Sequence, residues 1–252
     1  MSPELPWSIR GGDMKIDIGC GGAKRAGFLG IDQSLAPGVD HILDIEHDRF
    51  PFNDNSIEHV YSSHCLEHLK NLNHTLSEIG RVCKDDATIE IIVPYGHHSD
   101  ALLVGHQTYH TEELWYHLTV IHSDFWCGTL NGRWLWTEID YVIDERILYD
   151  LRNHGIAIDL AIRYFNNVVK EMRLRFSYKS DLSWKPTTPR RYLTTSRFGE
   201  RQTLPAPFDG TATGHDFAAW TIASRGGQAV DSPKSIFQRG RNAIVRKFRA
   251  LR

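Results

Sequence analysis

The sequence predicts an α/β fold, in which a parallel sheet has helices packed on its faces. Short runs rich in Ile and Val recur through the first hundred residues, as expected for buried strands. A stretch with apolar residues three or four positions apart, typical of an amphipathic helix, separates the last two runs. Strands that alternate with helices favour parallel pairing, because each parallel connection needs a crossover.

The predicted strands come first along the chain. Five apolar runs qualify, in the order KIDIGC, FLGID, HILDI, IEHVYSS and ATIEIIV, beginning at residues 15, 28, 41, 57 and 87. The predicted helix is LEHLKNLNHTLSEIGRVCKD, which begins at residue 66. Its stripe predicts one buried face, formed by Leu66, Leu69, Leu72, Leu76, Ile79 and Val82.

The composition changes after Pro94. Residues 97–122 hold six of the 14 histidines, and four of the seven tryptophans lie between residues 115 and 136. A capping threonine predicts a helix over residues 111–118, and Asn131-Gly132 between aromatic runs predicts a hairpin. Residues 172–178 are expected to add a strand that completes an antiparallel end of the sheet. The tryptophans could face a sugar or aromatic acceptor, or form a hydrophobic lid on the sheet.

The chain is divided on composition into four parts. Residues 1–14 form an N-terminal segment, and 15–185 form the main domain, with the aromatic and His-rich part (about 95–140) as a substrate cap. Residues 186–233 contain prolines and glycines and are expected to be irregular. Residues 234–252 are predicted to form a basic amphipathic helix.

The charge is low overall but uneven. A net charge of −2 gives no argument for a nucleic-acid partner, and none is predicted for the main domain. Residues 234–252 carry seven Lys or Arg and no acid. A basic helix with Phe237, Ile244, Phe248 and Leu251 on one face could contact an anionic membrane peripherally. The alternatives are docking on a partner or nucleic acid, or packing on its own domain.

The remaining composition indicates a cytoplasmic protein. The first residues carry prolines and acids rather than the basic start and apolar core of a signal peptide. No apolar run approaches the roughly 20 residues that span a bilayer. The four cysteines have no C-x-x-C spacing, so reduced thiols are expected. The oligomeric state is not indicated.

The turn after the first strand is the strongest functional signal. Parallel sheets bind ligands beyond the carboxyl ends of their strands, and the residues DIGCGG put Gly19 and Gly21 at such a turn. A dinucleotide site would show G-x-G-x-x-G and an acid about 20 residues later. Here Lys24 occupies the third glycine position, and Asp32 follows Gly21 by only 11 residues. The pyrophosphate signature is therefore incomplete.

Four motifs in register resemble class I S-adenosylmethionine-dependent methyltransferases over roughly residues 15–118. DIGCGG followed by GFLGID resembles the compact GCG…GF.GID subgroup, often associated with glycan or small-molecule biosynthesis. LDIEHDRFPFNDNSIEHVYSSHCLEHL resembles that family's stretch from the third to the fourth strand, and EIGRVCKDDATIEIIVP resembles its following helix and fifth strand. The resemblance implies a Rossmann-like, mostly parallel seven-stranded sheet with helices on both faces.

The resemblance also implies where S-adenosylmethionine binds. Asp32 would accept the ribose hydroxyls, the glycine turn and Asp17 would hold the amino-acid end, and His64 would lie near the sulfonium. The full set of implied cofactor residues is Asp17, Gly19, Gly21, Asp32, Asp44, Ile45 and His64.

Histidines after the fifth strand are the catalytic candidates. Methyl transfer to a hydroxyl requires a proton acceptor, and an imidazole is suited to it. The candidates are His97, His98 and His106, with His106 favoured by the resemblance, whereas Glu67 and His68 are expected to serve the fold. Together with Asp100 and His110 these histidines raise a metal site as a minority option, because the spacing fits no zinc motif, and no metal is predicted.

The predicted function is S-adenosylmethionine-dependent methyl transfer, to an oxygen of a sugar, glycan or other small molecule. N- or C-methylation of a small natural product is the alternative reaction. A non-catalytic subunit that binds the cofactor or a partner is a second alternative. A metal-dependent hydrolase built on the histidines is a third, and it predicts no affinity for S-adenosylhomocysteine.

Overall fold

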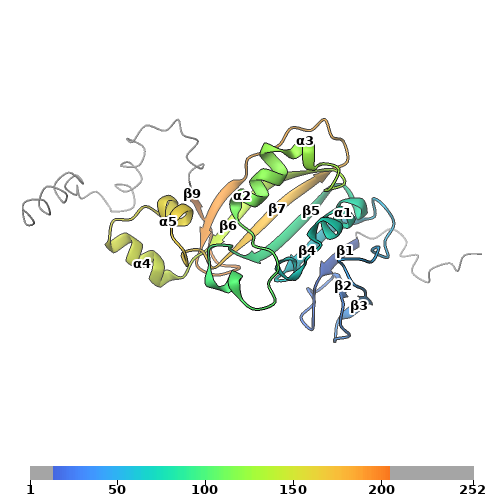
Figure 1. Ribbon diagram of the computed structural model, residues 1–252, viewed down its shortest axis with the longest axis horizontal. Coiled ribbons are helices and arrows are strands. Elements are labelled where there is room, and N and C mark those ends of the chain that lie inside the picture. The colour runs from blue at the N-terminus through green and yellow to red at the C-terminus, as the bar shows by residue number, and fades with distance from the viewer. Residues whose placement is uncertain (1–13, 205–252) are drawn as a thin grey trace, which may run out of the picture. The chain divides into compact units, whose positions relative to one another are not determined.

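The computed structural model describes residues 14–204, whose strands form one mixed sheet (Figure 1). The sheet order is β3-β2-β1-β4-β5-β7-β6-β8-β9. The strands are β1 (Met14–Ile18), β2 (Leu29–Asp32), β3 (Val39–Ile42), β4 (Ile57–Ser63), β5 (Cys83–Pro94), β6 (Arg133–Val142), β7 (Glu171–Lys179), β8 (Arg190–Thr194) and β9 (Gln202–Leu204).

The first five strands confirm the predicted parallel pairing and four of the five predicted runs, whereas β3 shares only residues 41 and 42 with the run expected at 41–45. β1 pairs with β2 on one side and with β4 on the other, and the chain continues outward to β3 and to β5. The direction of winding thus reverses at β1. In open parallel sheets a ligand crevice forms beyond the carboxyl ends of strands at such a reversal.

The other half of the sheet corrects the predicted strand number. β7 confirms the strand expected at residues 172–178 and runs antiparallel to both β5 and β6. β8 pairs parallel with β6, and β9 pairs antiparallel with β8. The described sheet therefore has nine strands with mixed pairing, because the Pro-containing stretch after residue 185 contributes two of them. Residues 1–13 and 205–252 lie outside the described residues, so the later part of the 186–233 segment and the helix predicted at 234–252 stay predictions.

The helices lie in the connections between strands. Helix α1 (Leu72–Val82) joins β4 to β5, and α2 (Glu112–Tyr116) confirms the helix expected after Thr111, whose hydroxyl accepts a hydrogen bond from Leu114 N. Within residues 14–204, no helix is both long and apolar enough to cross a bilayer. The other helical segments are η1 (Leu66–His68), η2 (Ser99–Leu102), η3 (His117–Ile121), α3 (Ser123–Trp126), α4 (Glu145–Asn153) and α5 (Ile158–Tyr164).

The predicted helix from residue 66 is divided in two. The short 3₁₀ turn η1 ends at His68, the next residue Leu69 has an extended backbone, and α1 begins at Leu72. A side chain from the loop after β3 explains the break: the Glu46 carboxylate accepts hydrogen bonds from the main-chain N–H groups of Lys70 and Asn71. These N–H groups therefore bond a carboxylate rather than a preceding helical turn.

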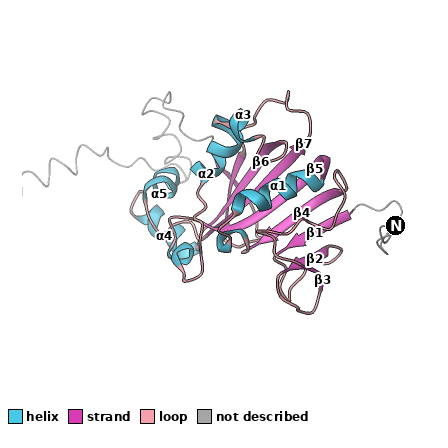
Figure 2. Ribbon diagram, turned by 45° about the vertical axis from the view of Figure 1, so that its right-hand side comes forward, coloured by secondary structure: helices cyan, strands magenta, loops and turns pink. Residues whose placement is uncertain are grey.

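Helices do not cover both faces of the described sheet equally. α1, α2 and α3 lie over the same face in both views (Figures 1 and 2), where Trp115 of α2 contacts Phe176 of β7 at 5.4 Å between ring centroids. The β1–β2 and β2–β3 connections contain no helix. The prediction of helices on both faces therefore fails on the side of those two connections, because ten residues between β1 and β2 close the turn without one.

The other face of the sheet carries paired charges. Glu90 of β5, which is 3% exposed, lies opposite Arg175 of β7, and Arg175 lies opposite Glu138 of β6. Arg175 Nη1 lies 2.5 Å from Glu138 Oε2, and Arg173 Nη2 lies 2.8 Å from Glu90 Oε1. Because each buried carboxylate has a guanidinium partner, this face tolerates charge where a helix would require apolar side chains.

Three of the four tryptophans are core residues rather than an acceptor platform, and of these Trp115 lies in α2 over the sheet whereas Trp134 and Trp136 belong to β6. Trp115, Trp134 and Trp136 are all 0% exposed, and each ring contacts Phe176. Only Trp126 of the four keeps partial exposure. The flat ring faces are used in the core, so the tryptophan-to-sugar hypothesis is wrong for these three.

The hairpin predicted at Asn131-Gly132 is also wrong. The two residues do adopt positive φ (49° and 147°), but they join α3 and its following turn to β6 instead of joining two strands. The Asn-Gly pair identifies a tight turn without specifying what precedes it.

Gly80 gives a test of the packing between α1 and the turn before β6. It is buried, and an added Cβ would overlap the main-chain oxygen of Leu130. Alanine normally stabilises a helix relative to glycine, but overpacking costs about 1–3 kcal/mol. We expect Gly80→Ala to lower the free energy of unfolding, measured by urea titration. Asn73→Ala, on the exposed side of α1, should change it by less than about 0.5 kcal/mol. An alanine variant at Gly80 as stable as the parent would contradict this packing.

Candidate functional site

A cavity of about 190 Å³ lies at the reversal of the sheet around β1. Its walls come from the carboxyl ends of β1, β2 and β4, from the loop after β3, and from η1. Five of the seven cofactor residues implied by the sequence line it: Gly19, Asp32, Asp44, Ile45 and His64. Those five residues come from four separate segments of the chain, and the fold places them around one cavity.

The turn after β1 needs glycine at its first position. Gly19 has φ +69°, and its N–H donates to the Ile31 carbonyl at 2.8 Å, which turns the chain sharply at the end of β1. An added Cβ would overlap the side chain of Cys65, which follows β4. Both the positive φ and the close approach exclude a side chain there. The main chain therefore forms the cavity wall.

Asp32 ends β2 and faces this turn. One oxygen, Oδ2, accepts a hydrogen bond from Gly21 N at 2.9 Å, and Oδ1 accepts one from Ser34 N at 2.9 Å. A carboxylate has about four lone-pair positions, so two remain for a ligand. Gly21 itself is absent from the cavity lining, and its N–H orients Asp32 from behind.

The loop after β3 forms the opposite wall. Asp44 is exposed, and a hydrogen bond from His47 holds the pKa of its carboxyl below the ordinary value. Ile45 is buried, and its carbonyl accepts the hydroxyl of Thr75 in α1 at 2.8 Å. This bond and the Glu46 bonds to the start of α1 hold the loop in place. The wall thus offers one apolar side chain beside one ionised carboxylate.

Asp17 has a supporting position. It is 2% exposed, does not line the cavity, and accepts a hydrogen bond from Arg25 N at 2.7 Å. Burial raises the pKa of its carboxyl, although the Arg25 bond opposes that shift. Asp17 therefore anchors the short β1–β2 connection, and its direct contact with a cofactor stays a prediction.

His64 lies directly after β4 and has φ +52°, an uncommon backbone for a residue with a Cβ. Its Nε2 lies 2.8 Å from Glu171 Oε2, and its Nδ1 lies 3.3 Å from Glu67 Oε1. Hydrogen bonds with Glu171 and with Glu67 raise the pKa of His64 to about 9. The ring is therefore mainly protonated at neutral pH and is not a free base.

Arg197 completes the pairing around Glu171. Its Nε donates to Glu171 Oε1 at 2.8 Å and its Nη2 to Oε2 at 2.7 Å, a bidentate geometry. Nη2 also lies 2.6 Å from His64 Nε2, but one nitrogen cannot hold both a proton and an incoming donor. Since His64 donates to Glu171 through Nε2, Arg197 bonds to the carboxylate alone.

The three catalytic candidates are not all brought together. His98 caps η2 and accepts a hydrogen bond from Asp100 N, and His97 lies against the ring of Tyr95 at 5.4 Å between centroids. Neither lines the cavity. His106 does lie beside the site, with its ring 4.7 Å from that of His68, which is a cavity residue.

The cavity also contains residues that the sequence argument left out. His68 was expected to serve the fold but lines the cavity, as do Gln33, Glu46, Cys65 and Leu69. The sequence signal for His68 was its position shortly after β4, at the edge of the sheet where ligands bind. The helix predicted to run unbroken from residue 66 hides this signal, because the orientation of His68 relative to the cavity depends on the break after η1.

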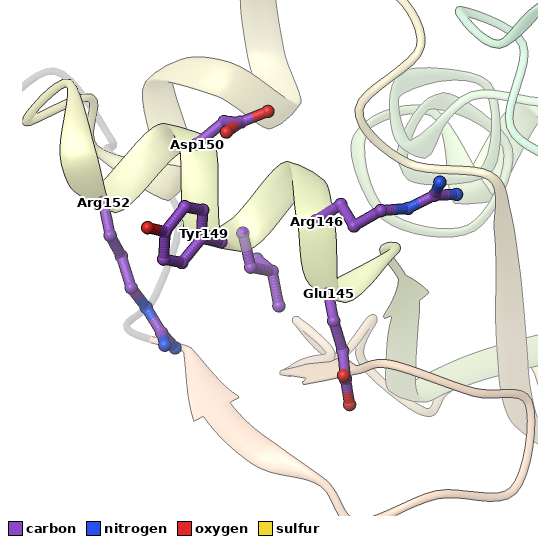
Figure 3. A pocket seen from close by; sticks show the side chains of 6 residues that line it. Glu145, Arg146, Tyr149, Asp150 and Arg152 are labelled. Carbon is purple, nitrogen blue, oxygen red and sulfur yellow. The ribbon is translucent and has the colours of Figure 1, made fainter.

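A larger surface depression, of about 680 Å³, lies along α4 (Figure 3). All its described lining residues belong to that one helix: Glu145, Arg146, Leu148, Tyr149, Asp150 and Arg152. No second described element contributes a side chain opposite them, so no set of polar groups converges there. The smaller cavity at β1 is the candidate site.

Comparison with known families agrees with this location. Residues 24–91, from the turn after β1 to the middle of β5, match a family model described as a methyltransferase domain. The match is to methyltransferases. It includes Asp32, Asp44, Ile45 and His64 but begins after the glycine turn. A comparison with curated proteins gave no match.

Several solved structures are similar to part of the chain. A SAM-dependent methyltransferase from Archaeoglobus fulgidus shares 17% identity with a TM-score of 0.47, over 67% of this chain and 87% of that chain. One from Mesorhizobium loti shares 12% with a TM-score of 0.43, over 66% and 91%. Geranyl diphosphate C-methyltransferase from Streptomyces coelicolor A3(2), solved with Mg²⁺, geranyl diphosphate and S-adenosyl-L-homocysteine, shares 11% with a TM-score of 0.42, over 66% and 71%.

Glu171 gives a pH-dependent test of the site's framework. Burial by itself raises the pKa of its carboxyl, but the bonds from Arg197 and His64 outweigh burial and lower it to about 2. An unfolded glutamate titrates near pH 4.3, so Glu171 stabilises the fold above that pH, and this contribution disappears as the pH falls toward 2. Glu171→Gln should therefore cost about 1–3 kcal/mol at pH 7.

The measurement is urea unfolding at several pH values. The stability difference between the parent protein and Glu171→Gln should narrow between about pH 4.5 and pH 2, across the window set by the two pKa values. Glu200→Gln changes an exposed carboxylate and serves as the control. A constant difference across that window would show that Glu171 is not ionised in the fold.

Proposed function

We propose that this protein transfers a methyl group from S-adenosylmethionine. The observation that carries the proposal is the position of Asp32, a carboxylate at the end of β2 that lines the cavity beside the Gly19 turn. Asp32 lies within the segment that matches a methyltransferase domain, and Gly19 lies just before that segment. A dinucleotide is disfavoured, because no helix follows the glycine turn to receive a pyrophosphate.

The residues of the cavity fit the parts of the cofactor. The ribose diol requires a hydrogen-bond acceptor, and Asp32 keeps lone pairs free beyond its bonds to Gly21 N and Ser34 N. The wall at Gly19 has no side chain, so a ligand can approach the main chain. Ile45 offers an apolar surface to an adenine ring. When bound, S-adenosylmethionine supplies an electrophilic methyl group on a sulfonium.

We infer that the acceptor atom is an oxygen of a glycan or other small molecule. A hydroxyl must lose its proton as the new O–C bond forms, and an imidazole beside the cavity can take it. His106 supports this inference, since it is the candidate histidine that contacts the cavity residue His68. His64 holds its own proton and orients Glu67 and Glu171, so it does not compete for this task.

Calorimetric titration with S-adenosylhomocysteine tests the cofactor assignment. Asp32→Ala removes charge-assisted hydrogen bonds worth about 1.5–3 kcal/mol, so affinity should fall by about 10- to 100-fold. Far-ultraviolet circular dichroism of each variant shows whether the fold is kept.

Asp150→Ala is the matched control, because it removes an exposed aspartate of α4 away from the cavity. Its affinity for S-adenosylhomocysteine should equal that of the parent protein. Absence of binding by the parent protein, or equal binding by a folded Asp32→Ala variant, would overturn the proposal.

The acceptor inference has its own measurement. Glycans and small hydroxylated molecules are incubated with the protein and S-adenosylmethionine, and the products are read by mass spectrometry. A product methylated on oxygen is expected, whereas a product methylated only on nitrogen or carbon would contradict the oxygen acceptor and leave the cofactor assignment intact.

A further inference from the structure

Two histidines and a glutamate converge beside the cavity, and the methyl-transfer argument uses only the contact between the two histidines. The ligand atoms of Glu67, His68 and His106 all lie within 4.8 Å of one another. Glu67 and His68 belong to η1, and His106 comes from the loop after η2. The two imidazole rings meet edge to face, at 86° and 4.7 Å between centroids.

Main-chain hydrogen bonds set which nitrogen each histidine presents. His68 Nδ1 lies 3.3 Å from the Gly105 carbonyl oxygen, and His106 Nδ1 lies 3.2 Å from the Ala101 carbonyl oxygen. A carbonyl only accepts, so both Nδ1 atoms carry the proton and both Nε2 atoms keep a lone pair. Metal-binding histidines are oriented by this same kind of bond at the other nitrogen.

Glu67 supplies a buried negative charge. The residue is 2% exposed, and its Oε1 is paired with His64, whose Nδ1 lies at 3.3 Å. Within the described residues, no partner lies in hydrogen-bonding geometry to Oε2. Burying a carboxylate is costly unless its oxygens are bonded or coordinate a metal. The free oxygen is therefore available as a ligand.

The loop that carries His106 is fastened to η1. The Glu67 carbonyl accepts hydrogen bonds from Gln107 N at 2.7 Å and from Thr108 N at 3.1 Å. The Thr108 hydroxyl donates to the Leu66 carbonyl at 3.0 Å. These bonds hold the loop against η1 before any ligand arrives, so the three side chains need little rearrangement to bind one.

We propose that Glu67, His68 and His106 bind a divalent transition-metal ion of the Zn²⁺ class. Two imidazole nitrogens and one carboxylate form a donor set used by catalytic zinc, and three protein ligands leave a coordination position open. His68 also lines the cavity, so the ion lies where an acceptor would reach it. The minority metal set of the sequence analysis is thereby replaced, since His110 instead stacks on Trp115.

The role of the ion rests on the proposed function. A bound cation lowers the pKa of a coordinated hydroxyl, as it does for water. The hydroxyl proton passes to solvent, the oxygen forms a bond to the methyl carbon, and the S–CH₃ bond breaks with its electron pair going to sulfur. In this role His106 holds the ion through Nε2 in place of acting as the base.

The test uses the full chain, stripped of metal with a chelator and then dialysed. Calorimetric titration with Zn²⁺ should show one tight site, and titration with Co²⁺ should produce a visible d–d band that Zn²⁺ abolishes. His68→Ala, His106→Ala and Glu67→Gln should each weaken Zn²⁺ binding by more than about 10-fold. Absence of a tight site in the parent protein would overturn the proposal.

His154→Ala is the matched control. Its Nδ1 bonds a main-chain carbonyl, that of Asp150, as the two proposed ligands do, but it lies at the end of α4 away from the cluster. Zn²⁺ affinity unchanged in this variant and reduced in the other three would support the site. Equal affinity in all four variants would place the metal elsewhere and overturn it.

Titration of the same samples with S-adenosylhomocysteine separates the two proposals, and far-ultraviolet circular dichroism shows whether each variant folds. Cofactor binding without a tight metal site refutes the metal proposal alone. A tight metal site that depends on the three ligands, without cofactor binding, refutes the methyltransferase proposal alone. Glu67→Gln keeps the shape of the side chain, so it remains informative if an alanine variant fails to fold.

Discussion

The carboxylate of Glu171 holds together the segments on which the site depends. Glu171 begins β7, and its partners His64 and Arg197 follow β4 and β8. These three segments are far apart in sequence, and the ion pairs of Glu171 with His64 and Arg197 hold them next to one another beside the cavity. His64 also pairs with Glu67, which links η1 to the same group of charges. Because Glu171 is buried, removing its two partners would leave its charge unpaired.

The short β1–β2 connection affects both the covering of the sheet and the geometry of the site. Without a helix there, Phe28 of the connection covers part of this face by packing with Tyr61 and Ile92. Elsewhere on the face, Glu90 and Arg175 are paired across strands. The same short turn brings Asp32 back to Gly21 within 11 positions, where the Gly21 N–H donates a hydrogen bond to the Asp32 carboxylate.

Much of the fold could be predicted because local pattern decides it. Four of the five apolar runs, the Thr111 cap and the strand at Glu171–Lys179 follow from side-chain periodicity and capping, which neighbouring residues set. Where the predictions failed, a distant group intervened. Glu46 interrupts the helix expected from residue 66, and β6 recruits β8 from a segment that composition marks as irregular. No local pattern contains such partners.

For the site, the sequence by itself determined the glycine turn, the acid at the end of β2 and the general position of the histidines. Their spacing reflects a strand, a turn and a strand, which are local structures. Only the tertiary structure decided which of the candidate histidines lies beside the cavity, because main-chain bonds to Glu67 fix the course of the segment that carries His106. It likewise decided that His68 faces the cavity and that three tryptophans belong to the core. Convergence of side chains requires the path of the backbone, which periodicity alone does not specify.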